Sequence, residues 1–122
     1  MKNQAYRMAL LYDFYGDMLT DRQKEFYDLY YNEDLSLAEI AENYGITRQG
    51  VRDVIVRAEA ILTELEDKTG IIRRFHKMQS QFDEIGAALE DIVRRNETIY
   101  QDEELERLCG RIGAVLTQLK QE

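Results

Sequence analysis

The chain has 122 residues, 44% of them hydrophobic, which suits one domain or one domain with a helical appendage. It carries 16 basic and 24 acidic side chains, and this net charge of −8 argues against non-specific binding of polyanions. A single cysteine excludes an internal disulfide and a multi-cysteine metal site, and it fits a reducing cytoplasm. No apolar run approaches the ~18 residues of a membrane span, and the absence of proline favours long helices.

The spacing of apolar residues, together with residues typical of helix ends, predicts two helices within residues 1–31. The first extends from about residue 3 to Tyr15 and ends at Gly16. Its apolar side contains Met8, Leu11, Tyr12 and Tyr15. Thr20 and Gln23 have the spacing of a capping box, which predicts a second helix from Asp21 to Tyr31. The expected core side of this helix contains Phe26, Leu29 and Tyr30.

Two further helices, separated by a tight turn, follow in the middle of the chain. Ser36 and Glu39 form a second capping-box pattern, which opens a helix from Leu37 to about Tyr44. Gly45 can adopt the positive φ of the turn, and Thr47 can cap a helix from Arg48 to about Lys68. Gly70 is the expected end of this last helix.

Residues 37–57 have the spacing of a helix-turn-helix motif. Ala41 occupies the position where the two helices cross closely, and Gly45 supplies the turn. The expected motif core consists of Ile40, Ala41, Gly45, Ile46, Val51, Val54 and Ile55. An ordinary αα-hairpin is the alternative interpretation of the same pattern.

The start of the second motif helix is the candidate nucleic-acid-binding surface. The predicted contact residues are Thr47, Arg48, Gln49, Arg52, Asp53, Val56 and Arg57. Arginine and glutamine suit guanine and adenine edges in the major groove, so DNA or RNA is one expected partner. Asp53 opposes phosphate binding, although a carboxylate can accept from cytosine. A protein-binding use of this surface, or a solvated helix face, remains the alternative.

Residues 71–122 are expected to form two long helices separated by a turn at residues 96–101. Apolar residues at alternating steps of three and four predict a coiled-coil seam on both helices. The seam contains Ile72, Phe75, Met78, Phe82, Ile85, Leu89 and Ile92, and then Leu105, Leu108, Ile112, Val115 and Leu119. The two helices pair within one chain as a hairpin or between chains as a homodimer. Gly86, Gly110 and Gly113 are expected to let the helices approach closely.

No residue pattern indicates catalysis. The chain contains no phosphate-binding glycine loop, no Ser/His/Asp set and no Cys/His cluster, so we assign no catalytic residue, metal or cofactor and expect a non-enzyme. His76 lies among basic residues without a carboxylate partner and is expected to be solvated. Cys109 follows Leu108 and is expected to be a buried small hydrophobe.

These motifs resemble two known groups of proteins. Residues 19–62 resemble the region-four helix-turn-helix of bacterial sigma factors through Leu19, Ser36, Glu39-Ile40-Ala41, Gly45-Ile46, Val51 and Arg57-Ala58. More closely, the chain resembles the YlxM family of helix-turn-helix proteins, most strongly from Leu10 to Gly70. The sequence segments specific to this resemblance are YGDMLTDRQ (15–23), DLSLAEIAE (34–42) and TRQGVRD (47–53).

The capping and seam patterns predict an all-α fold, with a helix-turn-helix domain at residues 1–70 and a helical hairpin or dimerisation segment at 71–122. The resemblance implies a cytoplasmic protein with a regulatory or accessory role in the signal recognition particle pathway, and the lack of a long apolar run argues against membrane insertion. The expected partners are therefore DNA, the particle's GTPase or RNA, and, through the coiled-coil seam, a second copy of the chain.

Overall fold

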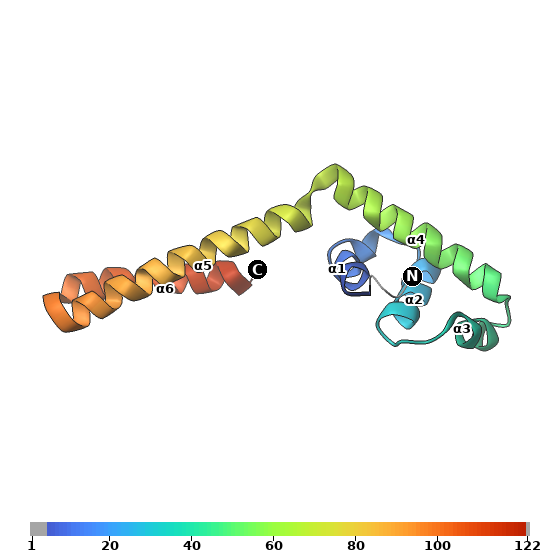
Figure 1. Cartoon of the computed structure of the whole chain (residues 1–122), viewed down its shortest axis with the longest axis horizontal. Helices are drawn as coiled ribbons and strands as arrows, with labels where there is room; N and C mark the ends of the chain where they lie inside the picture. The colour runs from blue at the N-terminus through green and yellow to red at the C-terminus, as the bar shows by residue number, and fades with distance from the viewer. Residues whose placement is uncertain (1–4, 122) are drawn as a thin grey trace. The chain divides into compact units, whose positions relative to one another are not determined.

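The computed structural model describes residues 5–121 and contains helices but no strand in that range, which confirms the all-α prediction (Figure 1). The chain divides into two compact units between Ile72 and Arg73. The elements of the first unit are α1 (Ala5–Tyr15), the 3₁₀ turn η2 (Gly16–Met18), α2 (Asp21–Tyr31), α3 (Leu37–Tyr44) and α4 (Arg48–Thr69). They are followed by α5 (Ile71–Arg95), the π-helical turn η3 (Asn96–Tyr100) and α6 (Glu103–Gln121).

The helix boundaries agree closely with the capping signals of the sequence. The Thr20 hydroxyl accepts a hydrogen bond from the Gln23 backbone amide at 3.2 Å, and the Gln23 side-chain oxygen accepts one from the Thr20 backbone amide at 3.0 Å. Ser36 and Glu39 form the same reciprocal pair at 3.1 and 3.2 Å. Both predicted capping boxes are therefore confirmed. Residues 3 and 4 of the predicted first helix lie outside the described residues.

In the first unit, α4 is the helix against which the others pack. α1, α2 and α3 all contact it, and Figure 1 shows α4, drawn in green, lying across them. One core cluster joins α1 to the second half of α4 and contains Met8, Leu11, Tyr15, Leu19, Tyr27, Ala58, Leu62 and Ile72. A second cluster joins α2 and α3 to the first half of α4 and contains Phe26, Tyr30, Ile40, Ala41, Val51 and Ile55.

Tyr27 is a fully buried core residue that the predicted core side of α2 omitted. Its hydroxyl donates to the backbone carbonyl of Met8 at 2.5 Å, and its ring stacks on Tyr12 with centroids 5.4 Å apart. A buried hydroxyl needs a partner, and α1 supplies it here from a distant part of the sequence. Tyr27 thereby fixes α1 to α2 through both packing and a hydrogen bond.

A buried carboxylate fixes the end of α4. Gly70 adopts φ +62° and ends the helix, as predicted. One oxygen of Glu66 accepts hydrogen bonds from the Tyr15 hydroxyl at 2.6 Å and from the Ile72 backbone amide at 2.9 Å. Ile72 is itself buried in the first cluster, which explains why the first unit extends to this residue.

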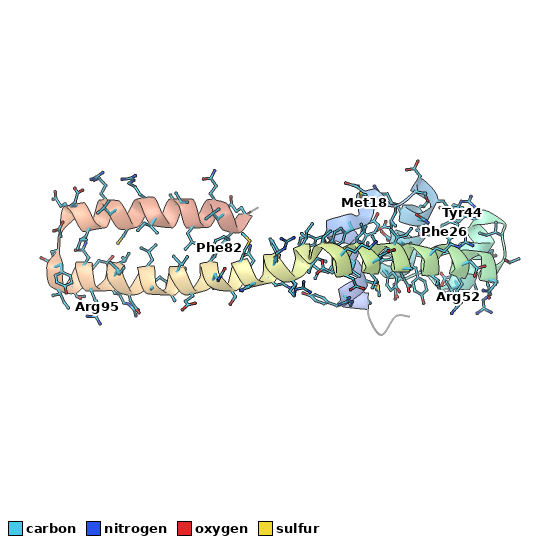
Figure 2. All side chains as sticks on the ribbon, turned by 90° about the horizontal axis from the view of Figure 1, so that it is seen from above. Met18, Phe26, Tyr44, Arg52, Phe82 and Arg95 are labelled. Carbon is cyan, nitrogen blue, oxygen red and sulfur yellow. The ribbon has the colours of Figure 1, made fainter. Side chains whose placement is uncertain are left out.

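The second unit is an antiparallel hairpin of α5 and α6. Figure 2 shows Phe82 between the two helices, and Lys120 Nζ lies 3.0 Å from Asp83 Oδ1 across them. A Cβ atom on Gly86 would lie 3.4 Å from Leu116, and one on Gly113 would lie 3.6 Å from Leu89. The two helices therefore pair within the chain, with both glycines at their contact.

The prediction for Gly110 is wrong. A Cβ atom on Gly110 would meet nothing within 4 Å, so this glycine faces open space and does not bring the helices together. Gly110 lies three residues before Gly113, a spacing that rotates it about 60° away from the contact.

The turn of the hairpin is held by side chains. The amide group of Asn96 bonds both the backbone carbonyl and the backbone amide of Asp102, each at 2.9 Å. The Asp102 carboxylate then accepts from the amides of Glu104 and Leu105, the free donors at the start of α6. The predicted turn at residues 96–101 is confirmed.

Candidate nucleic-acid interface

The turn between α3 and α4 is built from one glycine and one threonine. Gly45 adopts φ +67°, a left-handed conformation, and its amide donates to the Ala41 carbonyl. The Ile46 amide donates to the same carbonyl at 3.1 Å. The Thr47 hydroxyl then accepts from the Gly50 amide at 2.9 Å, so α4 begins at Arg48. The predicted helix-turn-helix is thus present as two capped helices with a sharp change of direction.

Gly50 is a part of this turn that the sequence interpretation missed. A Cβ atom at this position would lie 3.1 Å from the Thr47 hydroxyl oxygen. The absence of a side chain therefore lets the hydroxyl fold over the first turn of α4 and reach the amide of residue 50. The available signal was a threonine N-cap with glycine three residues later.

The expected motif core is largely buried. Ile40, Val51 and Ile55 have no exposed surface, and Ala41 is 6% exposed, as expected where two helices cross. Ile46 and Val54 are half-buried against the same cluster, whereas Gly45 lies exposed in the turn. These contacts hold the start of α4 in a fixed position relative to α3.

The end of α3 is also fixed to α2. The Tyr44 hydroxyl donates to the Glu25 carboxylate, and its ring lies edge-on to Phe26 with centroids 4.9 Å apart. The hydrogen bond to Glu25, with a contribution from burial, raises the pKa of Tyr44 above its ordinary value. Through these two contacts Tyr44 fixes the end of α3, and with it the turn, to α2.

All of the predicted contact residues are exposed, on α4 or at its N-cap: Thr47, Arg48, Gln49, Arg52, Asp53, Val56 and Arg57. We call them the α4 face. Helical spacing places the six residues after Thr47 in two neighbouring rows along α4, because residues four apart lie above one another. One row is Arg48, Arg52 and Val56, and the other is Gln49, Asp53 and Arg57. Figure 2 shows Arg52 on the opposite side of α4 from Phe26 and Tyr44.

The charges of the α4 face are predominantly positive. Among residues 5–121, no acidic group lies within ion-pair distance of Arg48, Arg52 or Arg57. Asp53 accepts a hydrogen bond from the Gln49 amide at 2.9 Å. Three arginines are therefore available to an external partner, while the carboxylate is engaged by a neutral neighbour.

The described part of the chain contains no cluster of His, Cys, Asp and Glu residues that could hold a metal ion. His76 is exposed and Cys109 is buried, as expected. No helix within residues 5–121 has the length and hydropathy needed to cross a membrane.

Comparison with known proteins gives one family. Residues 2–104 match the UPF0122 family, described as "Putative helix-turn-helix protein, YlxM / p13 like". A UPF0122 protein of Thermoanaerobacter sp. (strain X514) is 40% identical over 92% of both chains. One from Acetivibrio thermocellus is 40% identical over 93% of this chain and 97% of the relative. One from Desulforamulus reducens is 48% identical over 67% of this chain and 70% of the relative.

The family is described by its helix-turn-helix and not by an enzymatic activity. The match includes the whole of the α3–α4 turn and the α4 face, together with α5 and the turn η3, and it ends at the start of α6. On this evidence, and with the expected fold present, the chain belongs to the UPF0122 family of YlxM / p13-like helix-turn-helix proteins.

Proposed function

We propose that this protein is a regulatory nucleic-acid-binding protein that presents the α4 face to the major groove of DNA. The observation that supports this most directly is the set of three exposed arginines without ion-pair partners in the described chain, next to the capped start of α4. The second helix of a helix-turn-helix reads bases through residues near its N-terminus. Arg52 and Gln49 have side chains suited to guanine and adenine.

Binding of DNA fragments from the gene's own neighbourhood tests this proposal. Fluorescence anisotropy at about 50 and about 200 mM salt should show weaker binding at the higher concentration, because arginines displace counterions from phosphates. Arg52→Ala should weaken binding about tenfold or more at low salt, the loss expected for a base contact. Lys68→Ala, a change at the far end of the same helix, is the matched control. Absence of sequence-dependent binding at low salt would refute the proposal.

A second candidate function is that of an adaptor in the signal recognition particle pathway. In this case the α4 face binds the particle's GTPase or its RNA and does not bind DNA. The resemblance to YlxM proteins implies the pathway, and the exposed carboxylate of Asp53 favours a partner that is not purely anionic. The net charge of −8 likewise favours a partner that is not purely anionic.

Pull-down with the purified particle separates these two candidates. Retention by the particle with and without its RNA would favour a protein contact, and retention only with RNA would favour an RNA contact. Arg52→Ala should reduce retention in either case if the α4 face is responsible. No retention in both conditions would reject the adaptor function.

A further inference from the structure

The hairpin of α5 and α6 uses only part of its apolar surface for its own packing. The helices contact each other through an inner stripe that includes Phe82, Leu89, Cys109 and Leu116. Cys109 and Leu116 are 7% and 8% exposed, which marks them as the core of this unit. Neither was part of the predicted seam, and the predicted seam residues beside them remain largely in contact with water.

These seam residues form a second stripe on each helix. On α5 it consists of Met78, Ile85 and Ile92, which lie seven residues apart and are 46% to 49% exposed. On α6 it consists of Leu108, Ile112, Val115 and Leu119, which are 38% to 56% exposed. We call these seven residues the outer stripe. Steps of seven, and of four and three, are the spacings at which one helix packs along another.

Both halves of the outer stripe lie on the same side of the hairpin. A groove of about 560 Å³ between the helices is lined by Phe82 and Ile85 from α5 and by Leu108, Ile112, Val115 and Leu119 from α6. A second hollow of the hairpin has a mixed lining, in which the charged residues Glu90, Arg94, Glu97 and Glu106 stand beside Leu89, Val93 and Cys109. The groove that carries the outer stripe is therefore the more apolar of the two.

The amount of exposed apolar surface fits a protein partner. At these exposures the outer stripe leaves on the order of 600 Å² of apolar surface in water, the upper end for a single patch on a monomer. Side-chain stems beside it, such as those of Gln81 and Arg111, bring the area toward the ~800 Å² per partner of a standard interface. Two helices with two stripes each are half of a four-helix bundle.

We propose that the outer stripe is the interface with a second copy of this chain, whose hairpin completes a four-helix bundle. A two-fold axis along the hairpin would place α5 of one copy antiparallel to α6 of the other, in the register found within each hairpin. That register is set by Gly86 opposite Leu116 and Leu89 opposite Gly113. The outer stripe would then meet its own copy along its whole length, as an isologous contact requires.

One pair of opposite charges beside the outer stripe agrees with this register. On α5 the bordering row contains Arg95 and Asp91, which pairs with Arg94 of its own helix, and on α6 it contains Glu104, Arg107 and Arg111. Residue numbers that face each other across the hairpin sum to about 202, so Asp91 would lie beside Arg111 of the second copy. Arg95 would face Arg107 of the second copy, whose guanidinium is already paired with Glu104 of its own helix. A membrane surface would instead call for a uniformly basic border.

Sedimentation of the full-length chain without nucleic acid tests this proposal independently of the proposed function. The wild-type protein should have twice the 14.4 kDa chain mass at tens of micromolar. The double change Ile85→Lys and Ile112→Lys should give a monomer with unchanged helical circular dichroism. The matched control is Ala87→Lys with Ala114→Lys, at exposed positions away from the outer stripe, and it should remain a dimer.

Charge reversal at the border provides a second test, which keeps the proposal falsifiable if the lysine variant fails to fold. Arg111→Asp alone should weaken the dimer at least tenfold, and adding Asp91→Arg should restore most of the loss. A wild-type monomer at 100 µM would overturn the proposal and leave the stripe to a different partner. A dimer that withstands the lysine changes, or a double reversal that restores nothing, would also overturn it.

Discussion

Gln49 and Asp53 are joined by a hydrogen bond of 2.9 Å on the exposed side of α4, one helical turn apart. The bond places the only carboxylate of the α4 face next to an amide that is itself a candidate base reader. Any anionic partner that approaches this surface meets both groups together. Under the proposed function, this pair would modulate the affinity of the three arginines for an anionic partner.

We expect Asp53→Asn to strengthen binding of DNA or RNA by the α4 face. The change removes one negative charge near the phosphates, which corresponds to about 1 kcal/mol or roughly fivefold in affinity at low salt. Fluorescence anisotropy at two salt concentrations measures it, and the gain should shrink as salt rises. Asp67→Asn is the control, because 14 residues along α4 separate it from Asp53 by ~21 Å, beyond the screening length. Equal gains in both variants would show that only net charge matters.

Gly45→Ala should destabilise the first unit by about 1 kcal/mol. The loss comes from backbone strain, because Gly45 has φ +67°, a conformation that residues with a side chain rarely adopt. A steric clash does not contribute, since an added Cβ would meet nothing within 4 Å. Gly110→Ala is the matched change, since its Cβ would also meet nothing but its backbone is helical. That variant should gain up to about 1 kcal/mol from helix propensity. Urea denaturation followed by circular dichroism should show opposite signs, and a stabilising effect at Gly45 would contradict the turn geometry.

Glu66→Ala should reduce the free energy of unfolding of the first unit by about 2 to 4 kcal/mol. The buried carboxylate accepts from the Tyr15 hydroxyl and the Ile72 amide, and hydrogen bonds to charged groups contribute about 1.5 to 3 kcal/mol each. Glu64→Ala is the control, because Glu64 forms an exposed ion pair with Lys68 that contributes less than about 1 kcal/mol. Urea denaturation followed by tyrosine fluorescence reports on this unit. Similar losses of unfolding free energy in the two variants would contradict the stabilising role assigned to Glu66.

Stability should fall steeply above pH 10, partly because of Tyr27. Burial raises the pKa of Tyr27 well above its ordinary value of 10.0 in the folded protein. The unfolded chain therefore loses this proton first as pH rises, so the stability present below pH 10 decreases by about 1.4 kcal/mol per pH unit above it. Tyr27→Phe should lower the slope of unfolding free energy against pH by that amount. An unaltered slope in Tyr27→Phe would contradict the assignment.

The helix-turn-helix could be predicted because its signals are local. The pairs Thr20–Gln23 and Ser36–Glu39 satisfy backbone amides within three residues, and Gly45 needs only its own φ. Such features do not depend on the rest of the fold, so the sequence specifies them directly. The exposure of Arg52 follows from the same reasoning, since Val51 and Ile55 on the same helix are buried.

The features that could not be predicted depend on distant partners. Tyr27 is buried because α1 supplies the Met8 carbonyl, and Glu66 is buried because Tyr15 and Ile72 surround it. In the hairpin, apolar spacing identified a seam but could not separate the stripe used inside the chain from the stripe left outside. α6 carries both stripes about one position apart, so Leu116 is buried while Val115 is exposed.

A nuclear magnetic resonance titration, in which DNA or the particle RNA is added to the full-length, ¹⁵N-labelled chain, tests the central claim most directly. The account predicts that the largest changes in amide chemical shift occur at residues 47–57. It also predicts that they are strongly reduced in Arg52→Ala and retained in Lys68→Ala. Changes concentrated in the hairpin or on α1, with residues 47–57 unaffected, would contradict the claim that the capped start of α4 is the binding surface.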